Sequence, residues 1–270
     1  MTIGKALTIA GSDSGGGAGI QADLKTFQEL DVYGMSVITA VTSQNTLGVH
    51  GVYPVPIEGV ISQLDAIAED LSPNAVKTGM LFNQEIIQIV SNKVQKHGWE
   101  KIVVDPVMIA KGGHPLLEES AINALINDLI PLSFIVTPNI PEAEAITGIE
   151  IKSFDDRKEA AKKICQMGAK HVIIKGGHQP SGSEIIDLLF DGHDFYEFKG
   201  NYVNTKHTHG TGCTFSAALT AELAKGKDVI EAVKTAKEFI HLAVENALGI
   251  GGGHGPTNHW AYKRNLAASK

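Results

Sequence analysis

Short runs of β-branched and other apolar residues alternate with amphipathic segments along most of this 270-residue chain. Alternation of this kind predicts an α/β fold in which a mainly parallel sheet is covered by helices on both faces. The expected strands are Ala6–Ala10, Ser36–Thr42, Ala75–Thr78, Lys101–Asp105, Phe134–Thr137 and His171–Lys175. The expected helices between them are Gln21–Leu30, Ile57–Leu71, Gln84–His97 and Asp156–Met167.

The region after the last of these strands has a different pattern. Two strand-like runs in Glu184–Phe198 flank Asp191-Gly192, which is a hairpin signal. Two further helices are expected over Thr214–Lys225 and Val229–Asn246. No internal repeat, low-complexity tract or linker rich in proline and serine interrupts the chain. The sequence therefore predicts a single domain over residues 1–270.

Polar residues follow nearly every expected strand. The segments at these exits are Gly11-Ser12-Asp13, Ser43-Gln44-Asn45, Lys77-Thr78-Gly79, Asp105-Pro106, Thr137-Pro138-Asn139 and Lys175-Gly176-Gly177. In open parallel sheets, ligands bind at the edge formed by the carboxyl ends of the strands. Any one polar loop is unremarkable on a protein surface, but their recurrence at successive exits favours a ligand site at this edge.

Composition and charge exclude several classes of function. The net charge of −7 disfavours a nucleic-acid partner, because phosphate backbones are bound by basic surfaces. The two cysteines, Cys165 and Cys213, are too few for a disulfide framework, which favours a reducing, cytoplasmic setting. The apolar run near the N-terminus is too short for a signal peptide, and no segment reaches the roughly 20 apolar residues of a membrane span.

The segment Gly15–Gly19 reads Gly-Gly-Gly-Ala-Gly and opens an expected helix, so its N–H groups could approach a ligand closely. It is not a Walker loop, because no Gly-Lys-Ser/Thr follows, and it is not a dinucleotide fingerprint, because Ile20 occupies the third glycine position. These departures disfavour a dinucleotide-dependent oxidoreductase, which the α/β alternation alone would permit. A flexible turn explains the segment equally well.

A sharper feature is the segment His209–Cys213, which precedes a helix rich in small residues. Gly210, Thr211 and Gly212 would place unpaired N–H groups at the helix start, an arrangement that stabilises charge on a transferring phosphoryl group. A thiol at this N-terminus is expected to have a lowered pKa, which makes Cys213 a candidate base. The alternatives are a tight turn packed on the sheet and a cysteine that is a small buried apolar residue.

Asn139 and Glu142 are three residues apart at another strand exit, with a proline between them. The carboxylate could hold Mg²⁺ directly or through water. The same spacing is typical of a helix capping box, so both interpretations stay open. Histidine pairs such as His207 and His209 lack cysteine or carboxylate partners at metal-ligand spacing, which disfavours structural zinc.

At these residues the chain resembles the ribokinase superfamily, and within it the hydroxymethylpyrimidine/phosphomethylpyrimidine kinases of thiamine synthesis. The resemblance covers nearly the whole chain. Its motifs are Ala6–Asp13, Gly15–Asp23, Asp105-Pro106-Val107-Met108, Thr137-Pro138-Asn139, Lys175-Gly176-Gly177-His178 and His209–Cys213. It implies a three-layer α/β/α fold, use of ATP and Mg²⁺, a small-molecule substrate and a homodimer, with the predicted hairpin as a small extension of the sheet.

The resemblance also implies roles for individual residues. The loop Gly210, Thr211, Gly212 and Cys213 matches the anion hole of the family, with Cys213 at the position of the base. Asp105 and Glu142 match positions associated with Mg²⁺, and Asn139, Lys175 and Lys237 match positions near the nucleotide. The expected substrate pocket is Gly11, Asp23, Gln44, Met80 and Val107.

The chain departs from its wider superfamily at the base, since most members carry aspartate where this chain has Cys213. A related branch of pyridoxal kinases shares this cysteine and has a second one where this chain has Ala110. The expected reaction is transfer of the ATP γ-phosphoryl group to the hydroxymethyl oxygen of the pyrimidine, and then to its monophosphate. Pyridoxal or pyridoxine kinase activity is the alternative within the class, and a nucleotide-binding regulator without turnover is the alternative outside it.

Overall fold

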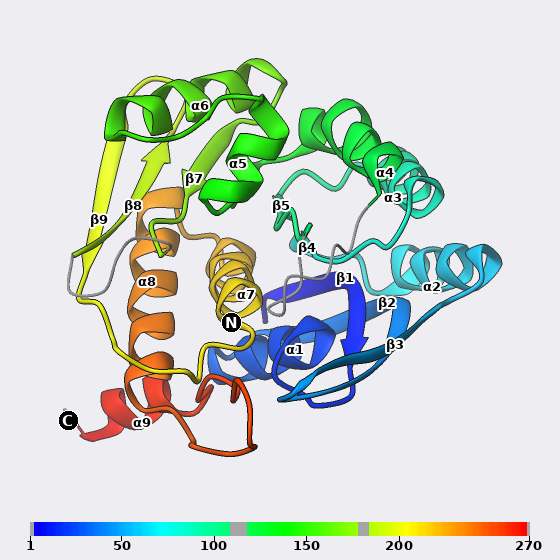
Figure 1. Ribbon diagram of the computed structural model, residues 1–270. Coiled ribbons are helices and arrows are strands. Elements are labelled where there is room, and N and C mark those ends of the chain that lie inside the picture. Colours follow the sequence, from blue (N-terminus) through cyan, green and yellow to red (C-terminus); the bar gives the residue numbers. More distant parts are fainter. Residues whose placement is uncertain (1–2, 109–117, 178–183, 269–270) are drawn as a thin grey trace.

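One nine-stranded sheet forms the centre of the computed structural model, which describes residues 3–108, 118–177 and 184–268 (Figure 1). Ala110 and His178 lie outside these described residues. The strand order is β3-β2-β1-β4-β5-β6-β7-β8-β9. Neighbouring strands in the middle of this order are joined through helices, as parallel pairing requires.

Six adjacent strands of the sheet are parallel: β1 (Lys5–Asp13), β2 (Tyr33–Asn45), β4 (Ala75–Thr78), β5 (Ile102–Val104), β6 (Ile135–Val136) and β7 (His171–Ile174). Their carboxyl ends therefore meet at one edge. Antiparallel strands flank them: β3 (Gly48–Pro54) at one end, and β8 (Ile185–Phe190) and β9 (Phe195–Gly200) at the other.

Helices cover both faces of the sheet. One face packs against α2 (Ile57–Asp70), α3 (Gln84–His97), α4 (Glu119–Ala124), α5 (Ile140–Thr147) and α6 (Phe154–Gln166), with the short π-helix η1 (Leu125–Leu129) and the 3₁₀ helix η2 (Ile130–Leu132). The other packs against α1 (Gly19–Glu29), α7 (Thr211–Ala224) and α8 (Val229–Glu245). The last helix, α9 (Ala261–Ala268), packs Tyr262 against Phe239 of α8.

The strand β5 shows how the sequence produces these layers. Ile102 and Val104 point into the core on one face of the sheet, and Val103 points into the core on the other. Because successive side chains of a strand alternate between faces, a strand buried on both sides must be apolar throughout. The predicted three-layer α/β/α fold with a mainly parallel sheet is therefore confirmed.

Most predicted elements agree with the structure to within a few residues. The helix α3 has the predicted bounds, and α7 begins one turn earlier than expected, at Thr211. The predicted hairpin is β8 and β9, joined by a connection of residues 191–194. The edge strand β3 was not anticipated. In the described part of the chain, no helix is both long and apolar enough to cross a lipid bilayer.

Candidate active site

A cavity of about 490 Å³ lies at the carboxyl edge of the parallel strands. Its wall combines the ends of these strands with the loops that follow them and the first turn of α7. The expected site residues that line it are Gly11, Gln44, Met80, Asp105, Val107, Asn139, Glu142, Lys175, Gly210, Thr211, Gly212 and Cys213. Two expected residues, Asp23 and Lys237, do not line it.

The first turn of α7 and the residue before it line this cavity. Gly210 precedes the helix in a left-handed conformation (φ 82°), and no side chain of the described residues caps the helix start. A Cβ atom at Gly210 would collide with the Gly17 carbonyl oxygen, so both the conformation and the packing require glycine. The N–H groups of Gly212 and Cys213 precede the first helical hydrogen bond, and they therefore form the positive end of the helix dipole.

A lysine and a carboxylate lie beside this helix start. Lys175 Nζ is 3.1 Å from Asp105 Oδ1, and Ser216 Oγ donates to Asp105 Oδ2 at 3.1 Å. A Cβ atom at Gly212 would lie 3.5 Å from Lys175 Nζ, so the helix N-terminus and the lysine adjoin. Burial opposes ionisation of Asp105, but Lys175 and Lys77 outweigh burial and hold the pKa of Asp105 below its usual range. The carboxylate is therefore charged at neutral pH.

The sequence left two interpretations of Glu142 open, a helix cap and a Mg²⁺ ligand. Its Oε2 accepts the N–H of Asn139 at 2.8 Å, and Asn139 Oδ1 accepts the N–H of Glu142 at 2.9 Å, which is a capping box. The same carboxylate lines the cavity. Burial raises the pKa of Glu142 to about 7, with Asp105 adding to the shift and Lys175 opposing it. The cap is confirmed, and the metal role stays a prediction.

The carboxylates on this part of the cavity wall fit Mg²⁺ if substrate phosphate oxygens supply further ligands. Within residues 3–108, 118–177 and 184–268, no three histidine, cysteine, aspartate or glutamate side chains converge as a preformed metal site. Mg²⁺ is commonly held by one or two carboxylates together with water and substrate phosphates. Asp105 and Glu142 are two such carboxylates on one cavity wall.

The expected lowering of the Cys213 pKa is wrong. Burial raises the pKa of Cys213 to about 11, and Asp23 and Asp105 add to the rise while Lys77 opposes it. Desolvation of the thiolate and two neighbouring carboxylates thus outweigh the favourable position at the helix start. The thiol lines the cavity, so it can reach a ligand, but it is protonated at neutral pH.

Lys77, on β4, lines the cavity and was not among the expected site residues. Its side chain is fully buried, and Nζ lies 2.9 Å from Asp23 Oδ2, which also accepts a hydrogen bond from Thr8 Oγ1 at 2.6 Å. Burial opposes the charge of Lys77, but Asp23 raises the pKa of this lysine above its usual value. Asp23 is fully buried and pairs with Lys77, and it does not line the cavity itself, so its expected contact with the substrate stays a prediction.

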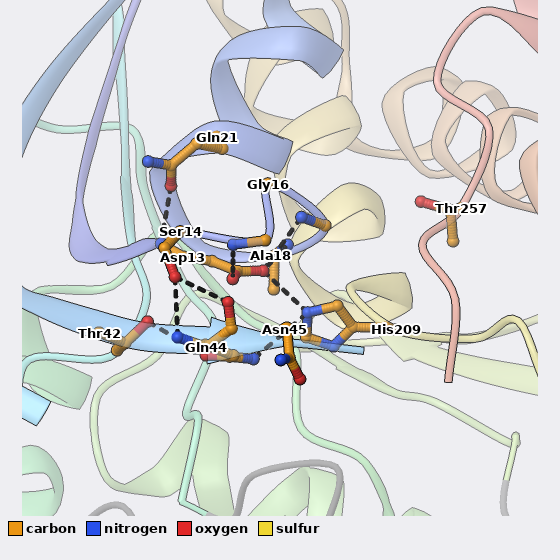
Figure 2. A network of polar contacts seen from close by, with 12 residues as sticks. Asp13, Ser14, Gly16, Ala18, Gln21, Thr42, Gln44, Asn45, His209 and Thr257 are labelled. Carbon is orange, nitrogen blue, oxygen red and sulfur yellow. Dashed lines mark hydrogen bonds and ion pairs between the residues drawn. The ribbon is translucent and has the colours of Figure 1, made fainter. Parts of the chain in front are cut away.

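Asp13 and His209 also line the cavity, and neither was given a role in the expected site (Figure 2). Asp13 accepts the N–H groups of Gly15, Gly17 and Ala18, so the glycine-rich loop is held in place. His209 Nε2 lies 2.8 Å from Asp13 Oδ2. Two signals were present in the sequence, an acid two positions before a glycine run and a histidine immediately before the anion-hole glycines, but no pattern paired these two residues.

Lys237 lies on α8 and lines a second cavity, of about 530 Å³, together with Phe198 and His241. Its Nζ is 2.6 Å from Asp187 Oδ2, and Asp187 Oδ1 accepts the N–H of Gly176 at 2.7 Å. Asp187 therefore links Lys237 to Gly176, the residue that follows Lys175. Its expected place near the nucleotide stays a prediction.

The fold has three layers, and the carboxyl edge of its parallel strands holds an open helix N-terminus beside a lysine and two carboxylates. This is the architecture of a ribokinase-like kinase. Pyridoxal kinase from Staphylococcus aureus in complex with ADP has this fold: its TM-score is 0.91 at 42% identity, covering 98% of this chain and 96% of that chain. Phosphomethylpyrimidine kinase from Clostridium difficile has a TM-score of 0.79 at 47% identity, covering 88% of this chain and 98% of that chain.

The sequence comparisons narrow the class to a family. Residues 13–258 match the family model described as phosphomethylpyrimidine kinase. The Bacillus subtilis protein named hydroxymethylpyrimidine/phosphomethylpyrimidine kinase is 63% identical, with 98% of each chain covered. The Haemophilus influenzae protein of the same name is 56% identical, with 97% of this chain and 98% of that protein covered. The chain belongs to the phosphomethylpyrimidine kinase family.

Proposed function

We propose that the chain is an ATP-dependent kinase that phosphorylates 4-amino-5-hydroxymethyl-2-methylpyrimidine and then its monophosphate to the diphosphate, for thiamine biosynthesis. The names of the two relatives described above support both steps. A 49% identical protein from Geobacter sulfurreducens, of which the chain covers 52%, is named thiamine biosynthesis bifunctional protein ThiED. That name supports the pathway.

The observation that carries the proposal is the open first turn of α7 beside Lys175. Phosphoryl transfer spreads negative charge over the transferred group, so an enzyme needs fixed positive groups where that charge develops. The N–H groups of Gly212 and Cys213 and the ammonium of Lys175 supply them in one place. Asp105 and Ser216 fix the position of these groups by accepting and donating hydrogen bonds beside the helix start.

The nucleotide binds, in this proposal, with its phosphates between Lys175 and the start of α7. Asn139 and Glu142 follow β6 on the same wall, where Asp105 and Glu142 would hold Mg²⁺. The metal would supply charge neutralisation of the β- and γ-phosphates. Lys237 is linked to Gly176 through Asp187, which supports a place for this lysine on the nucleotide side.

The substrate hydroxyl must lose its proton when its oxygen attacks the γ-phosphorus. Cys213 is the cavity-lining group placed at the start of α7 to take that proton. Its raised pKa means that the thiolate, once formed, is a strong base, and that few molecules hold it at neutral pH. The pyrimidine ring lies, in this proposal, in the part of the cavity lined by Gly11, Gln44, Met80 and Val107.

Pyridoxal phosphorylation is a second candidate activity, and a specific observation favours it. The Staphylococcus aureus pyridoxal kinase in complex with pyridoxal has a TM-score of 0.91 to this chain at 42% identity. The higher identity of the pyrimidine kinases, at 63% and 56%, makes the pyrimidine our first choice.

We also propose that the chain is one kinase domain that forms a homodimer in the cytoplasm. The continuous sheet supports a single domain. The edge strand β3 and the exposed Val41, Leu47 and Tyr53 around it support pairing with a second copy, because such edges need cover. The two unpaired cysteines support a reducing compartment.

A coupled assay of ADP release tests the proposed function, with hydroxymethylpyrimidine, its monophosphate and pyridoxal compared side by side. We expect turnover with both pyrimidines and a smaller kcat/KM for pyridoxal. Excess EDTA should abolish turnover, and added Mg²⁺ should restore it. ADP release that does not depend on any added substrate would contradict the proposal.

A further inference from the structure

The cavity wall also contains a polar network around Asp13, His209 and Gln44, whose donors and acceptors can be counted (Figure 2). At its centre is Asp13, which is 3% exposed and accepts three backbone N–H groups, from Gly15, Gly17 and Ala18. Burial opposes ionisation, but His209 and these N–H groups hold the pKa of Asp13 below its usual range. Asp13 is therefore a carboxylate, which accepts hydrogen bonds and has none to donate.

The contact with Asp13 fixes what His209 Nε2 can do. This nitrogen lies 2.8 Å from Asp13 Oδ2, so the hydrogen between them belongs to the imidazole. The same His209 Nε2 lies 3.3 Å from the amide nitrogen of Gln44. A ring nitrogen that carries a hydrogen cannot accept one from an amide NH₂, so in this orientation two donors face each other.

The other end of the Gln44 amide has the matching conflict. Thr42 Oγ1 lies 2.8 Å from the backbone oxygen of Ser12 and 3.2 Å from Gln44 Oε1. A hydroxyl has a single hydrogen, and the shorter contact with a carbonyl oxygen takes it. Thr42 Oγ1 can then only accept, and in this orientation it faces another acceptor.

We propose that the Gln44 amide works turned by half a rotation, with its oxygen toward the N–H of His209 and its NH₂ toward Thr42 Oγ1. The rotation removes the conflict at Thr42, whose Oγ1 can accept from the NH₂. At His209 it replaces two facing donors with an amide oxygen that shares the Nε2 hydrogen with the nearer Asp13 carboxylate. The rotation preserves the packing because the two ends of an amide are nearly the same size. His209 and Thr42 are then positioning residues that determine which end of Gln44 is the donor. Asp13 acts one step further away by keeping the hydrogen on His209 Nε2.

The orientation determines what the cavity presents to a ring. The amide oxygen has a second lone pair and the NH₂ a second hydrogen, and Gln44, Thr42 and His209 all line the cavity. A ligand meets a donor on the Thr42 side and an acceptor on the His209 side. Resting on the proposed function, this inference places the ring nitrogen of an aminopyrimidine toward Thr42 and its amino group toward His209.

The test compares two substrates that differ only in this pattern. 4-Amino-5-hydroxymethyl-2-methylpyrimidine presents an acceptor beside a donor, and its 4-oxo analogue presents a donor beside an acceptor. A bidentate amide contact of this kind is worth about 1–3 kcal/mol of discrimination, or roughly 5- to 150-fold. The wild-type enzyme should therefore prefer the amino compound in kcat/KM by roughly that factor.

Two variants release the amide from its partners. His209→Leu removes the donor, and Thr42→Val removes the acceptor with little change of shape. In the double variant, Gln44 can present its amide to the ring in either orientation. The ratio of kcat/KM for the amino compound to kcat/KM for the oxo compound should therefore fall toward one. His254→Leu is the control, since His254 is exposed and bonds to Lys206 O away from Gln44.

Each outcome has one meaning. A preference that collapses in the double variant and persists in the His254 control supports the inference. An unchanged preference, or a parallel loss for both substrates, would overturn it. If the wild-type enzyme does not phosphorylate the amino compound at all, the proposed function fails, which is a different result from an unchanged ratio.

A measurement on the wild-type protein needs no variant. Long-range ¹H–¹⁵N correlation spectra distinguish a ring nitrogen that carries a hydrogen from one that does not, and Asp13→Asn can assign the affected signal. We expect the His209 Nε2 signal to be of the hydrogen-bearing type. A signal of the unprotonated type would mean that His209 accepts from the Gln44 NH₂, which would overturn the proposed orientation.

Discussion

The two ends of the cavity use different physical means. At the phosphate end, Lys175, Asp105 and Glu142 place three ionisable groups around the start of α7. At the ring end, the carboxylate of Asp13 is saturated by the backbone of the glycine loop and by His209. What the ring end presents to a ligand through Gln44 is a neutral amide.

This difference separates catalysis from selection. Charge at the phosphate end stabilises any transferring phosphoryl group, whatever molecule accepts it. The neutral amide at the ring end adds little attraction of its own, and it discriminates by the direction of its donor and acceptor. Variants at the phosphate end should therefore reduce turnover of every substrate, whereas variants at the ring end should change the ratio between substrates.

The largest effect is expected for Cys213→Ala, at the boundary between the phosphate end and the ring end. An alcohol must lose a proton in the first phosphorylation, and general-base assistance is worth about 10²–10⁴-fold. The monophosphate has a second pKa near 6 and is already largely ionised at neutral pH. The variant should slow phosphorylation of hydroxymethylpyrimidine by that factor and slow phosphorylation of its monophosphate far less, as measured by single-turnover kinetics.

The pH dependence of the first step provides a check on the same residue. The base form of Cys213 is the thiolate, so a pKa of about 11 predicts that the rate rises with pH across the neutral and mildly alkaline range. Cys213→Ala should lose this rise. Equal losses in both steps, with the pH slope intact, would assign Cys213 to the geometry of the anion-hole loop.

The next largest effect is expected for Lys175→Met. Removal of one preorganised donor from developing charge typically costs about 10²–10³-fold in rate. Because this lysine acts on the phosphoryl group, both steps and any pyridoxal turnover should fall together. The exposed Lys170, just before β7, is the matched control, and Lys170→Met should leave the kinetics unchanged. A loss confined to one substrate would contradict the division between the two ends, and thermal unfolding of each variant separates lost chemistry from lost folding.

A smaller and more selective effect is expected for Gln44→Met. Loss of the amide should reduce kcat/KM for hydroxymethylpyrimidine by roughly 5- to 150-fold, from the 1–3 kcal/mol of a bidentate contact. Pyridoxal has a ring nitrogen and a phenolic oxygen in a different arrangement, so its kcat/KM should change far less. A parallel decrease for both substrates would show that Gln44 supports the pocket without reading the ring.

The contrast between the two ends also explains what the sequence could predict. The phosphate end is built from strand exits and a helix start, features that apolar periodicity and glycine spacing locate directly. Asp105, Lys175 and the loop before α7 were found in this way. The ring-end partners Asp13 and His209 are 196 positions apart, and no local pattern indicates that the two side chains meet.

The sequence also did not show how deeply the ionisable side chains are buried. A cysteine at a helix start suggests a low pKa, but the surroundings of Cys213 reverse the direction. Asp23 matched a family position, yet position alone does not show that its carboxylate is buried against Lys77 and that only Lys77 lines the cavity. The strand β3 was missed because Gly48–Pro54 contains two glycines and ends in proline, which weaken the strand pattern.

The last expected effect, for Glu142→Gln, is on stability rather than turnover. The pKa of Glu142 is raised from its ordinary value of 4.5 to about 7, so between these values the folded state binds more protons than the unfolded state. The stability that this difference contributes is fully present below pH 4.5 and is lost as the pH rises through 7. Ionisation of the buried carboxylate then costs on the order of 3 kcal/mol, from the size of the shift.

Glutamine cannot ionise, yet its amide oxygen can still accept the Asn139 N–H and preserve the capping box. Denaturant unfolding should therefore show Glu142→Gln and wild type nearly equal at pH 4.5, and the variant more stable by up to about 3 kcal/mol at pH 8. Glu159→Gln, at an exposed site on α6, should give differences within about 0.5 kcal/mol at both pH values. A variant that is less stable than wild type at pH 8 would mean that the attraction between Glu142 and Lys175 exceeds the cost of burial. In that case the charges of the phosphate end would stabilise the folded protein. The expected result means instead that the ionised Glu142 destabilises the folded protein.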